Sequence, residues 1–277
     1  MPEFSIVTIV KGRRKQLENL LQSVKSSTVL PSDIQIVFMD DPRGTFFPDG
    51  LNVKIHQLNS SQELPLAAAR NFGINATQTE NIVFIDVDCI VSPTLFESLL
   101  GSLEDHKIIS AYPKYLPTVP DEVNYKDIEN QAVAHPSREN IPAGKPVDHL
   151  QFWSLIFAVT KNTFNKIGGF DETFAGYGAE DTDFAMSFHR KGIEHIFAAD
   201  FILHQYHDKY DPPLNYFDSI IANARRYHQK WNVLPMQKWL RAFENLGLIK
   251  ISENQEIQVL SKPSEVQIKN CLSKLPY

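Results

Sequence analysis

The sequence predicts an α/β protein in which a doubly wound, mixed sheet is flanked by helices. Three observations indicate this fold. Short apolar runs alternate with segments of helical periodicity through residues 1–112. Most of these runs are continuously apolar, as in strands that are buried on both faces. Aspartates follow two of the runs directly, at the strand ends where open α/β sheets bind ligands.

The first half of the chain alternates strands and helices. Leu17, Leu20, Leu21 and Val24 share one helical face, and Pro65 is placed to open a second helix. Ser92 and Pro93 suit the start of a third helix. The order β-α-β-α-β implies parallel strands with right-handed crossovers. We expect strands at residues 4–10, 34–39, 53–58, 82–85 and 107–112, and helices at 13–26, from 65, and at 94–106.

The second half begins with an irregular segment at residues 113–147, rich in proline and polar residues. A segment of this length without regular structure is usually functional or mobile, and we expect only a short helix in it, near residues 125–134. Order returns with strands at 152–160 and 193–203, separated by a helix that carries Phe184 and Phe188. Helices are expected at 217–231 and 236–246. A small hairpin is expected at 249–251 with 257–260, and a last helix after it.

The composition is that of an ordinary globular protein, with 277 residues, 43% hydrophobic and 22% charged. The net charge of −6, without a block of Lys and Arg, argues against nucleic acid as the main partner. Cys89 and Cys271 form neither a disulfide framework nor a zinc spacing. The sequence has no signal-peptide pattern and no uncharged apolar run of membrane-spanning length. We therefore expect a cytoplasmic protein, and contact with a membrane surface stays open.

Asp86 and Asp88 follow the central apolar run in NIVFIDVDCIVS. With the period of a strand, both carboxylates project to the same side of the chain. Two hard oxygen ligands at the carboxyl end of a buried strand suit a divalent cation. The alternative is that they only cap the following helix, but Ser92 and Pro93 already suit that role.

Glycines and acids gather in FDETFAGYGAEDTDF. Gly176 and Gly178 would let the backbone approach a ligand closely. Glu180 and Asp181 precede a helix, where acids also interact favourably with the helix dipole without any ligand. A ligand-binding role and a purely structural role both remain open for these acids.

Two histidines, His204 and His207, follow the strand expected at residues 193–203. Side chains three residues apart do not point the same way from a regular strand. They could converge on a metal only if the chain turns there. The alternative is an ordinary pair of surface histidines.

Taken together, these stretches resemble inverting glycosyltransferases of the GT-A type, which use nucleotide sugars. The N-terminal half looks like family 2 of that class, through FSIVTIVKGRRKQLENLLQSV, IQIVFMDD, AAARNFGIN and FIDVDCIV. Residues 152–207 are similar to the C-terminal part of β-1,4-galactosyltransferases, through FAVTKNTFNKIGGFDETFAGYGAEDTDFAMSFHRKG and HQYH. The resemblance implies a GT-A domain at residues 1–234, with a nucleotide-sugar-binding half at 1–112 and an acceptor and catalytic half at 150–234, followed by an extension at 235–277.

The resemblance also implies a metal site. Asp86 and Asp88 match the DxD motif that binds the cation and the nucleotide sugar, with Asp88 as the direct ligand. His207 matches a further ligand, as does His204, where those relatives have methionine. Histidine is a harder metal ligand than the methionine of those relatives, so Mn²⁺ is favoured and Mg²⁺ is the alternative.

For the donor, the resemblance implies contacts to uracil and ribose from the first strand–helix turn. Either Asp40 or Asp41 would hold the uridine, and Arg70 would approach the diphosphate or the base. The other implied donor-binding residues are Thr8, Val10, Arg13, Tyr177 and Gly178.

For the reaction, the resemblance implies that Glu180 binds the acceptor and that Asp181 is the catalytic base. Tyr177 stands where galactosyltransferases carry a tryptophan between donor and acceptor sugars. The expected activity is metal-dependent transfer of galactose or N-acetylgalactosamine from a UDP-sugar to a saccharide or glycolipid hydroxyl, with inversion, as in polysaccharide biosynthesis.

The sequence is compared with the expectations for two other functions. A sugar nucleotidyltransferase also uses acids and a metal, but it would show a glycine-rich basic loop after the first strand, and VKGRRKQL has one glycine. A non-catalytic sugar-binding module would not need both acidic motifs. For residues 235–277, a subdomain, a partner surface and a membrane-surface contact all stay open.

Overall fold

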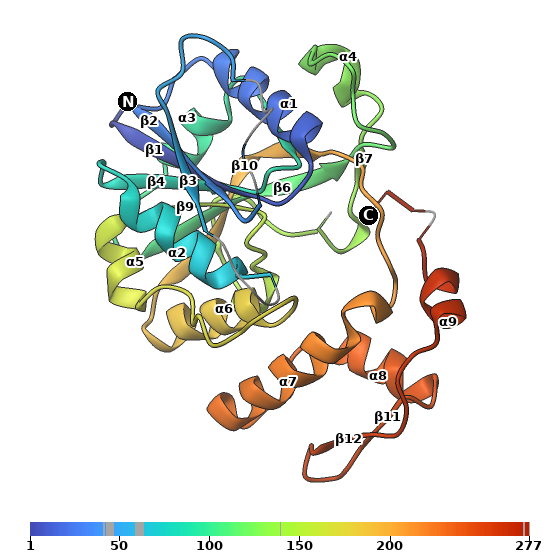
Figure 1. The fold of residues 1–277 in the computed structure, drawn as a ribbon. Coiled ribbons are helices and arrows are strands. Elements are labelled where there is room, and N and C mark those ends of the chain that lie inside the picture. The colour runs from blue at the N-terminus through green and yellow to red at the C-terminus, as the bar shows by residue number, and fades with distance from the viewer. Residues whose placement is uncertain (41, 43–46, 59–63, 139, 274, 277) are drawn as a thin grey trace.

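The computed structural model describes residues 1–40, 42, 47–58, 64–138, 140–273 and 275–276. Its centre is a mixed sheet in the order β3-β2-β1-β4-β9-β6-β10-β5, which confirms the expected fold class (Figure 1). The first four strands are parallel, β9 is antiparallel to both neighbours, and β6 and β10 are parallel to each other. The strands are β1 (Phe4–Val10), β2 (Asp33–Phe38), β3 (Val53–Gln57), β4 (Asn81–Ile85), β5 (Cys89–Val91), β6 (Lys107–Tyr115), β9 (Ile156–Thr160) and β10 (Glu194–His204).

Helices cover both faces of this sheet (Figure 1). Alternate side chains of β1 enter different cores, as strand geometry requires. Ile6 packs in a core with residues of α1 (Arg14–Lys25) and α3 (Leu95–Leu100). Val7 packs in a core with residues of α2 (Leu66–Ala76), α5 (Lys161–Ile167) and α6 (Glu180–Arg190). The sheet is therefore buried on both sides, which explains its continuously apolar strands.

Some elements are shorter than the sequence predicts. The helix expected at 94–106 ends at Leu100, because Gly101 is a poor helix former and Glu104 and Asp105 would face the negative end of the helix dipole. The prediction that Ser92 caps this helix is wrong as well. Thr94 occupies the cap position, and the hydroxyl of Ser92 donates to Asp200 Oδ1 at 3.0 Å instead.

The segment expected to be irregular carries short elements that lie against the sheet. It contains α4 (Tyr125–Glu129), β7 (Val133–Ala134), β8 (Pro146–Val147) and two turns of 3₁₀ helix, η1 (Pro136–Arg138) and η2 (His149–Gln151). Buried Arg138 helps to fix the segment, since its Nη1 donates to the Gln151 carbonyl oxygen at 2.8 Å and its guanidinium lies 3.5 Å from the ring centre of Trp153. With residues 149–153 in this arrangement, β9 begins at Ile156 rather than at residue 152.

The C-terminal part forms a lobe beside the sheet (Figure 1). The expected hairpin and last helix are confirmed. Phe217, Ile220, Leu240, Phe243 and Ile257 belong to a core of its own. Helix α7 shares this core with residues beyond 235. The domain division after residue 234 stays a prediction. The lobe contains η3 (Leu214–Tyr216), α7 (Phe217–Trp231), α8 (Gln237–Asn245), β11 (Ile249–Ile251), β12 (Ile257–Val259) and α9 (Glu265–Asn270).

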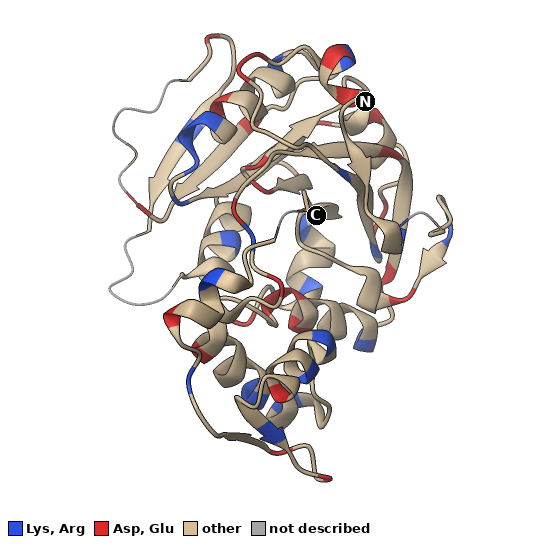
Figure 2. Ribbon diagram, turned by 90° about the vertical axis from the view of Figure 1, so that its right-hand side faces the viewer, with Lys and Arg blue, Asp and Glu red and all other residues tan. Residues whose placement is uncertain are grey.

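Charge is distributed unevenly between the two parts. The C-terminal lobe, residues 214–277, has nine Lys and Arg against five Asp and Glu, whereas acidic residues outnumber basic ones in the rest of the chain (Figure 2). The excess of acidic residues therefore belongs to the sheet part of the chain, where an anionic ligand would need local cations. No helix in the described ranges is long and apolar enough to cross a membrane.

Candidate active site

The DVD motif forms a tight turn between β4 and β5. The backbone N–H of Cys89 donates to the carbonyl oxygen of Asp86 at 3.1 Å, and the N–H of Asp86 donates to the carbonyl oxygen of Leu155, the residue before β9, at 2.9 Å. The carbonyl oxygen of Asp88 accepts from the N–H of Gln205 at 2.7 Å. The backbone of the motif is therefore fixed directly to the segment that carries the two histidines.

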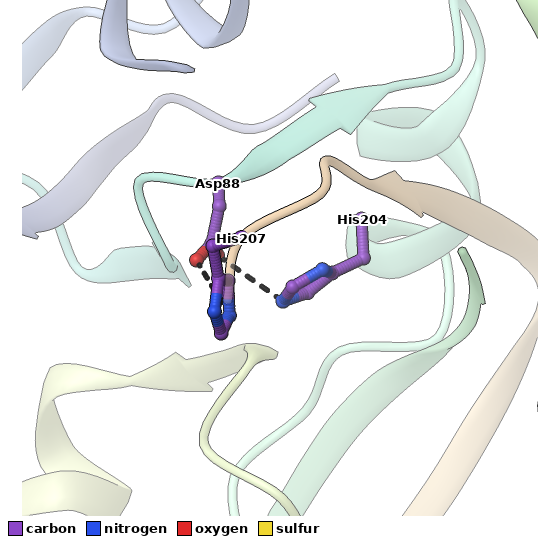
Figure 3. A group of neighbouring side chains, drawn as sticks. All are labelled: Asp88, His204 and His207. Atoms are coloured by element: carbon purple, nitrogen blue, oxygen red, sulfur yellow. Dashed lines mark ion pairs between the residues drawn. The ribbon is translucent and has the colours of Figure 1, made fainter. Parts of the chain in front are cut away.

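Asp88, His204 and His207 converge (Figure 3). His204 Nε2 lies 3.4 Å from Asp88 Oδ1, and His207 Nε2 lies 3.5 Å from Oδ2. One ligand atom from each residue lies within 4.8 Å of the others. His204 is the last residue of β10, and the chain leaves the sheet after it. The turn that sequence reasoning required for convergence is therefore present.

The protonation of this cluster suits a metal. His207 Nδ1 lies 2.8 Å from the carbonyl oxygen of Asp208, which can only accept, so Nδ1 carries the proton and Nε2 presents its lone pair toward Asp88. Burial lowers the pKa of His204 to about 4, which keeps its imidazole neutral at physiological pH. Asp88 Oδ1 is buried and accepts no hydrogen bond from the described residues. A carboxylate with two neutral imidazoles fits a divalent cation.

The first strand–helix turn adds positive charge beside this cluster. Arg13 forms an ion pair with Asp88 through Nη1 and Oδ2. Asp40, at the end of β2, accepts from the N–H of Gly12 at 2.8 Å and so fixes the turn. Thr8 and Val10 are buried within β1, and Thr8 Oγ1 has no described hydrogen-bond partner. Asp41 lies outside the described residues.

Arg70 and Glu180 form the second part of the site. Arg70 Nη1 lies 3.1 Å from Glu180 Oε1, and the N–H of Gly178 donates to Oε2 at 3.1 Å. Arg70 also lies near two aromatic rings, with its guanidinium 5.4 Å from the ring centre of Phe84 and 5.3 Å from that of Phe170. Both oxygens of Glu180 therefore have partners within the protein.

Asp181 differs from its neighbour. Its Oδ1 accepts from the N–H of Thr182 at 2.7 Å, whereas Oδ2 has no hydrogen-bond partner among the described residues. The side chain is half-buried at the start of α6. Burial and the adjacent charge of Glu180 raise the pKa of Asp181 to about 6, against the opposing effect of Arg70. A carboxylate with a free oxygen and a pKa near neutrality can act as a general base.

Asp86 connects the two parts electrostatically. Burial raises the pKa of Asp86 to about 7, with Arg70 opposing this shift and Asp88 adding to it. Arg13 and Glu180 act on the same carboxyl group. Groups of the metal-type cluster and of the Arg70–Glu180 pair therefore act on the same carboxyl group.

Residues 175–179, which we call the glycine loop, are fixed by α7 of the C-terminal lobe. Asn223 Nδ2 donates to the carbonyl oxygens of Ala175 and Gly178, each at 2.9 Å. Gly178 has φ of +99°, which favours glycine. The ring of Tyr177 stacks on Tyr216 and on Trp239, with centroids 4.5 and 5.9 Å apart.

Sequence reasoning missed Asn223, Tyr216 and Trp239, because no spacing in the sequence links them to the glycine loop. It also missed that Arg13 pairs with Asp88. Of the expected site residues, the structure brings together Arg13, Arg70, Asp86, Asp88, Tyr177, Gly178, Glu180, Asp181, His204 and His207 by the contacts and charge interactions above.

A sequence comparison with known families matches residues 49–199 to the family described as "Glycosyltransferase like family 2". The match includes the DVD turn and the glycine loop. Two curated relatives are validoxylamine A glucosyltransferases of Streptomyces hygroscopicus subsp. limoneus and subsp. jinggangensis, each 23% identical over 223 residues. Each alignment covers 70% of this chain and respectively 49% and 53% of the relative. The chain thus spans about half the length of these relatives.

Solved structures share the fold. The crystal structure of S. aureus TarS 1–349 in complex with UDP-GlcNAc has a TM-score of 0.58 at 14% identity, covering 87% of this chain and 73% of that one. The crystal structure of GalNAc-T7 with UDP, GalNAc and Mn²⁺ has a TM-score of 0.57 at 16% identity, covering 75% of this chain and 44% of that one. The fold is that of GT-A glycosyltransferases, and the family 2 part of the resemblance is confirmed. The likeness of residues 152–207 to β-1,4-galactosyltransferases stays a prediction.

Proposed function

The chain belongs to the family 2-like glycosyltransferases, and from this premise we propose that it is a metal-dependent, inverting enzyme that transfers a hexose from a UDP-sugar to a hydroxyl of a saccharide or glycolipid. The observation that carries this proposal is the convergence of Asp88, His204 and His207. Asp181 follows Glu180, whose charge acts on Asp86 of the same DVD motif. Such a site combines a place for a nucleotide diphosphate with a base for the acceptor.

In this proposal Asp88, His204 and His207 hold the cation. A bound divalent ion would neutralise charge that develops on the leaving diphosphate. Arg13 lies at the first strand–helix turn, which Asp40 contacts through the N–H of Gly12, and the uridine would bind there. Mn²⁺ is the favoured ion, and the presence of Mn²⁺ in the GalNAc-T7 structure supports this choice.

The proposed base is Asp181. Its free Oδ2 would accept the proton of the acceptor hydroxyl. At the same time the hydroxyl oxygen of the acceptor would attack the anomeric carbon, and the bond from that carbon to the diphosphate would break. Because one displacement from the face opposite the leaving group suffices, the configuration inverts. Glu180, which is held by Arg70 and Gly178, would help to shape the acceptor side of the site.

The donor sugar is proposed as galactose or N-acetylgalactosamine, from the resemblance of residues 152–207 to β-1,4-galactosyltransferases. The names of similar proteins mention several sugars: the GalNAc-T7 structure holds GalNAc, the TarS structure holds UDP-GlcNAc, and the curated relatives are glucosyltransferases. A donor screen therefore needs UDP-galactose, UDP-N-acetylgalactosamine, UDP-glucose and UDP-N-acetylglucosamine.

The test is calorimetric titration of the protein with UDP, with and without Mn²⁺, followed by assay of the four UDP-hexoses for slow hydrolysis. We expect UDP binding that depends on Mn²⁺, and hydrolysis of one donor well above the others. Absence of UDP binding under both conditions would overturn the proposal.

A further inference from the structure

Lys209 carries a positive charge beside the proposed metal cluster. It follows His207 by two residues, so their Cα atoms are at most about 7 Å apart. Its Nζ lies 5.6 Å from the ring centre of Tyr115, and that ring lies 4.9 Å from the ring of His204. Lys209 therefore shares an aromatic contact with one of the histidines.

The ammonium group has no partner of its own in the described part of the chain. It makes no hydrogen bond or ion pair there, although the side chain is half-buried. The nearby acids make their direct contacts with other groups: Asp208 accepts from the hydroxyl of Tyr206 at 3.3 Å, and Asp211, whose charge acts on Lys209 without direct contact, accepts from Lys238 at 3.0 Å. A half-buried ammonium group without a direct ion pair or hydrogen bond is costly, so the position is suited to an anionic ligand.

The C-terminal tail fixes the backbone at this position. The carbonyl oxygen of Lys209 accepts from the N–H of Ser273 at 2.7 Å, and the N–H of Asp211 donates to Cys271 at 2.8 Å. Tyr210 and Leu272 form an antiparallel bridge between these two hydrogen bonds. The chain thus returns from α9 to hold the segment that carries Lys209 (Figure 1).

We propose that Lys209 binds the diphosphate of the donor and stabilises it as it leaves. This inference rests on the proposed function, because it takes the ligand to be a UDP-sugar. As the bond from the anomeric carbon to the β-phosphate oxygen breaks, its electron pair stays on that oxygen. The Lys209 ammonium donates a hydrogen bond to the diphosphate and keeps its proton. A lysine supplies a compact point charge for a phosphate group.

The test compares UDP with uridine, which lacks both phosphates, in the presence of Mn²⁺. Calorimetry measures UDP affinity, and ligand-observed NMR measures uridine affinity. The variants are Lys209→Gln, Lys209→Arg as the conservative rescue, and Lys262→Gln as the control. Lys262 is an exposed lysine of the C-terminal lobe, paired with Asp218. Circular dichroism and the thermal midpoint establish that each variant is folded.

We expect Lys209→Gln to weaken UDP binding roughly 10- to 100-fold, the range of one hydrogen bond to a charged group, and to leave uridine binding unchanged. Lys209→Arg should restore most of the UDP affinity. Equal UDP affinity of wild type and Lys209→Gln would overturn this inference and leave the proposed function standing. A parallel loss of uridine binding would also overturn it, since the effect would then lie in the shape of the site. A wild type that does not bind UDP would overturn the proposed function and this inference together.

Discussion

Arg70 and Glu180 form a buried ion pair, with Nη1 of the arginine 3.1 Å from Oε1 of the glutamate. The pair connects α2 to the first turn of α6 across the glycine loop. The side chains are only 5% and 6% exposed. Because the protein itself occupies both oxygens of Glu180, the adjacent Asp181 is the acid that retains an oxygen for substrate.

Removal of Glu180 should destabilise the fold. Glu180→Ala leaves the Arg70 guanidinium buried without its counter-charge, which typically costs about 3 to 5 kcal/mol. Urea unfolding measures the loss. The matched control is Asp181→Asn, one residue along the same helix, which we expect to change the free energy of unfolding by less than about 1 kcal/mol. Equal stability of Glu180→Ala and wild type would show that the pair contributes little.

Turnover should fall in acid with the titration of Asp181. The base acts when ionised, and its pKa is raised to about 6 by burial and Glu180. We therefore expect kcat at saturating donor and Mn²⁺ to be constant above this pH and to fall about tenfold for each unit below it. The dissociation constant of UDP at the same pH values is the control for metal and donor binding. A kcat that stays constant down to pH 5 would rule out this assignment.

Removal of one imidazole should weaken the metal site. His207→Ala deletes a proposed ligand, and we expect Mn²⁺ affinity to fall at least about tenfold, since changes in outer-shell partners alone cost that much. Electron paramagnetic resonance of free Mn²⁺ during titration measures the affinity. His189→Ala is the control, as His189 is exposed at the end of α6. Unchanged affinity in His207→Ala would make the histidine pair an ordinary surface feature.

Local patterns were sufficient to predict the strands and the acids that follow them. Continuous apolar runs predicted β1, β2 and β4, because burial on both faces excludes polar residues from such strands. The position of Asp86 and Asp88 followed from the end of β4. The expectation for His204 and His207 was conditional on a turn, since the direction of the chain after β10 depends on contacts with the DVD turn.

Contacts between distant segments could not be predicted in this way. β9 lies between β4 and β6 and is antiparallel to both. Its partners in β4 are more than 70 residues away along the chain, and its partners in β6 are about 50 residues away. No short sequence pattern encodes pairing over such separations. Likewise, Asn223 reaches the glycine loop and Ser273 reaches Lys209 through tertiary folding alone. These contacts use ordinary residue types whose spacing carries no signal.

The most direct test of the account is the turnover of Asp181→Asn, measured together with its affinity for UDP in Mn²⁺. Asparagine keeps the size and the hydrogen-bonding shape of the side chain but cannot accept the acceptor's proton. We predict that turnover of the donor falls by about 10²- to 10⁴-fold, the usual contribution of a general base, while the dissociation constant of UDP changes less than about twofold. Transfer at the wild-type rate would contradict the assignment of Asp181 as the base.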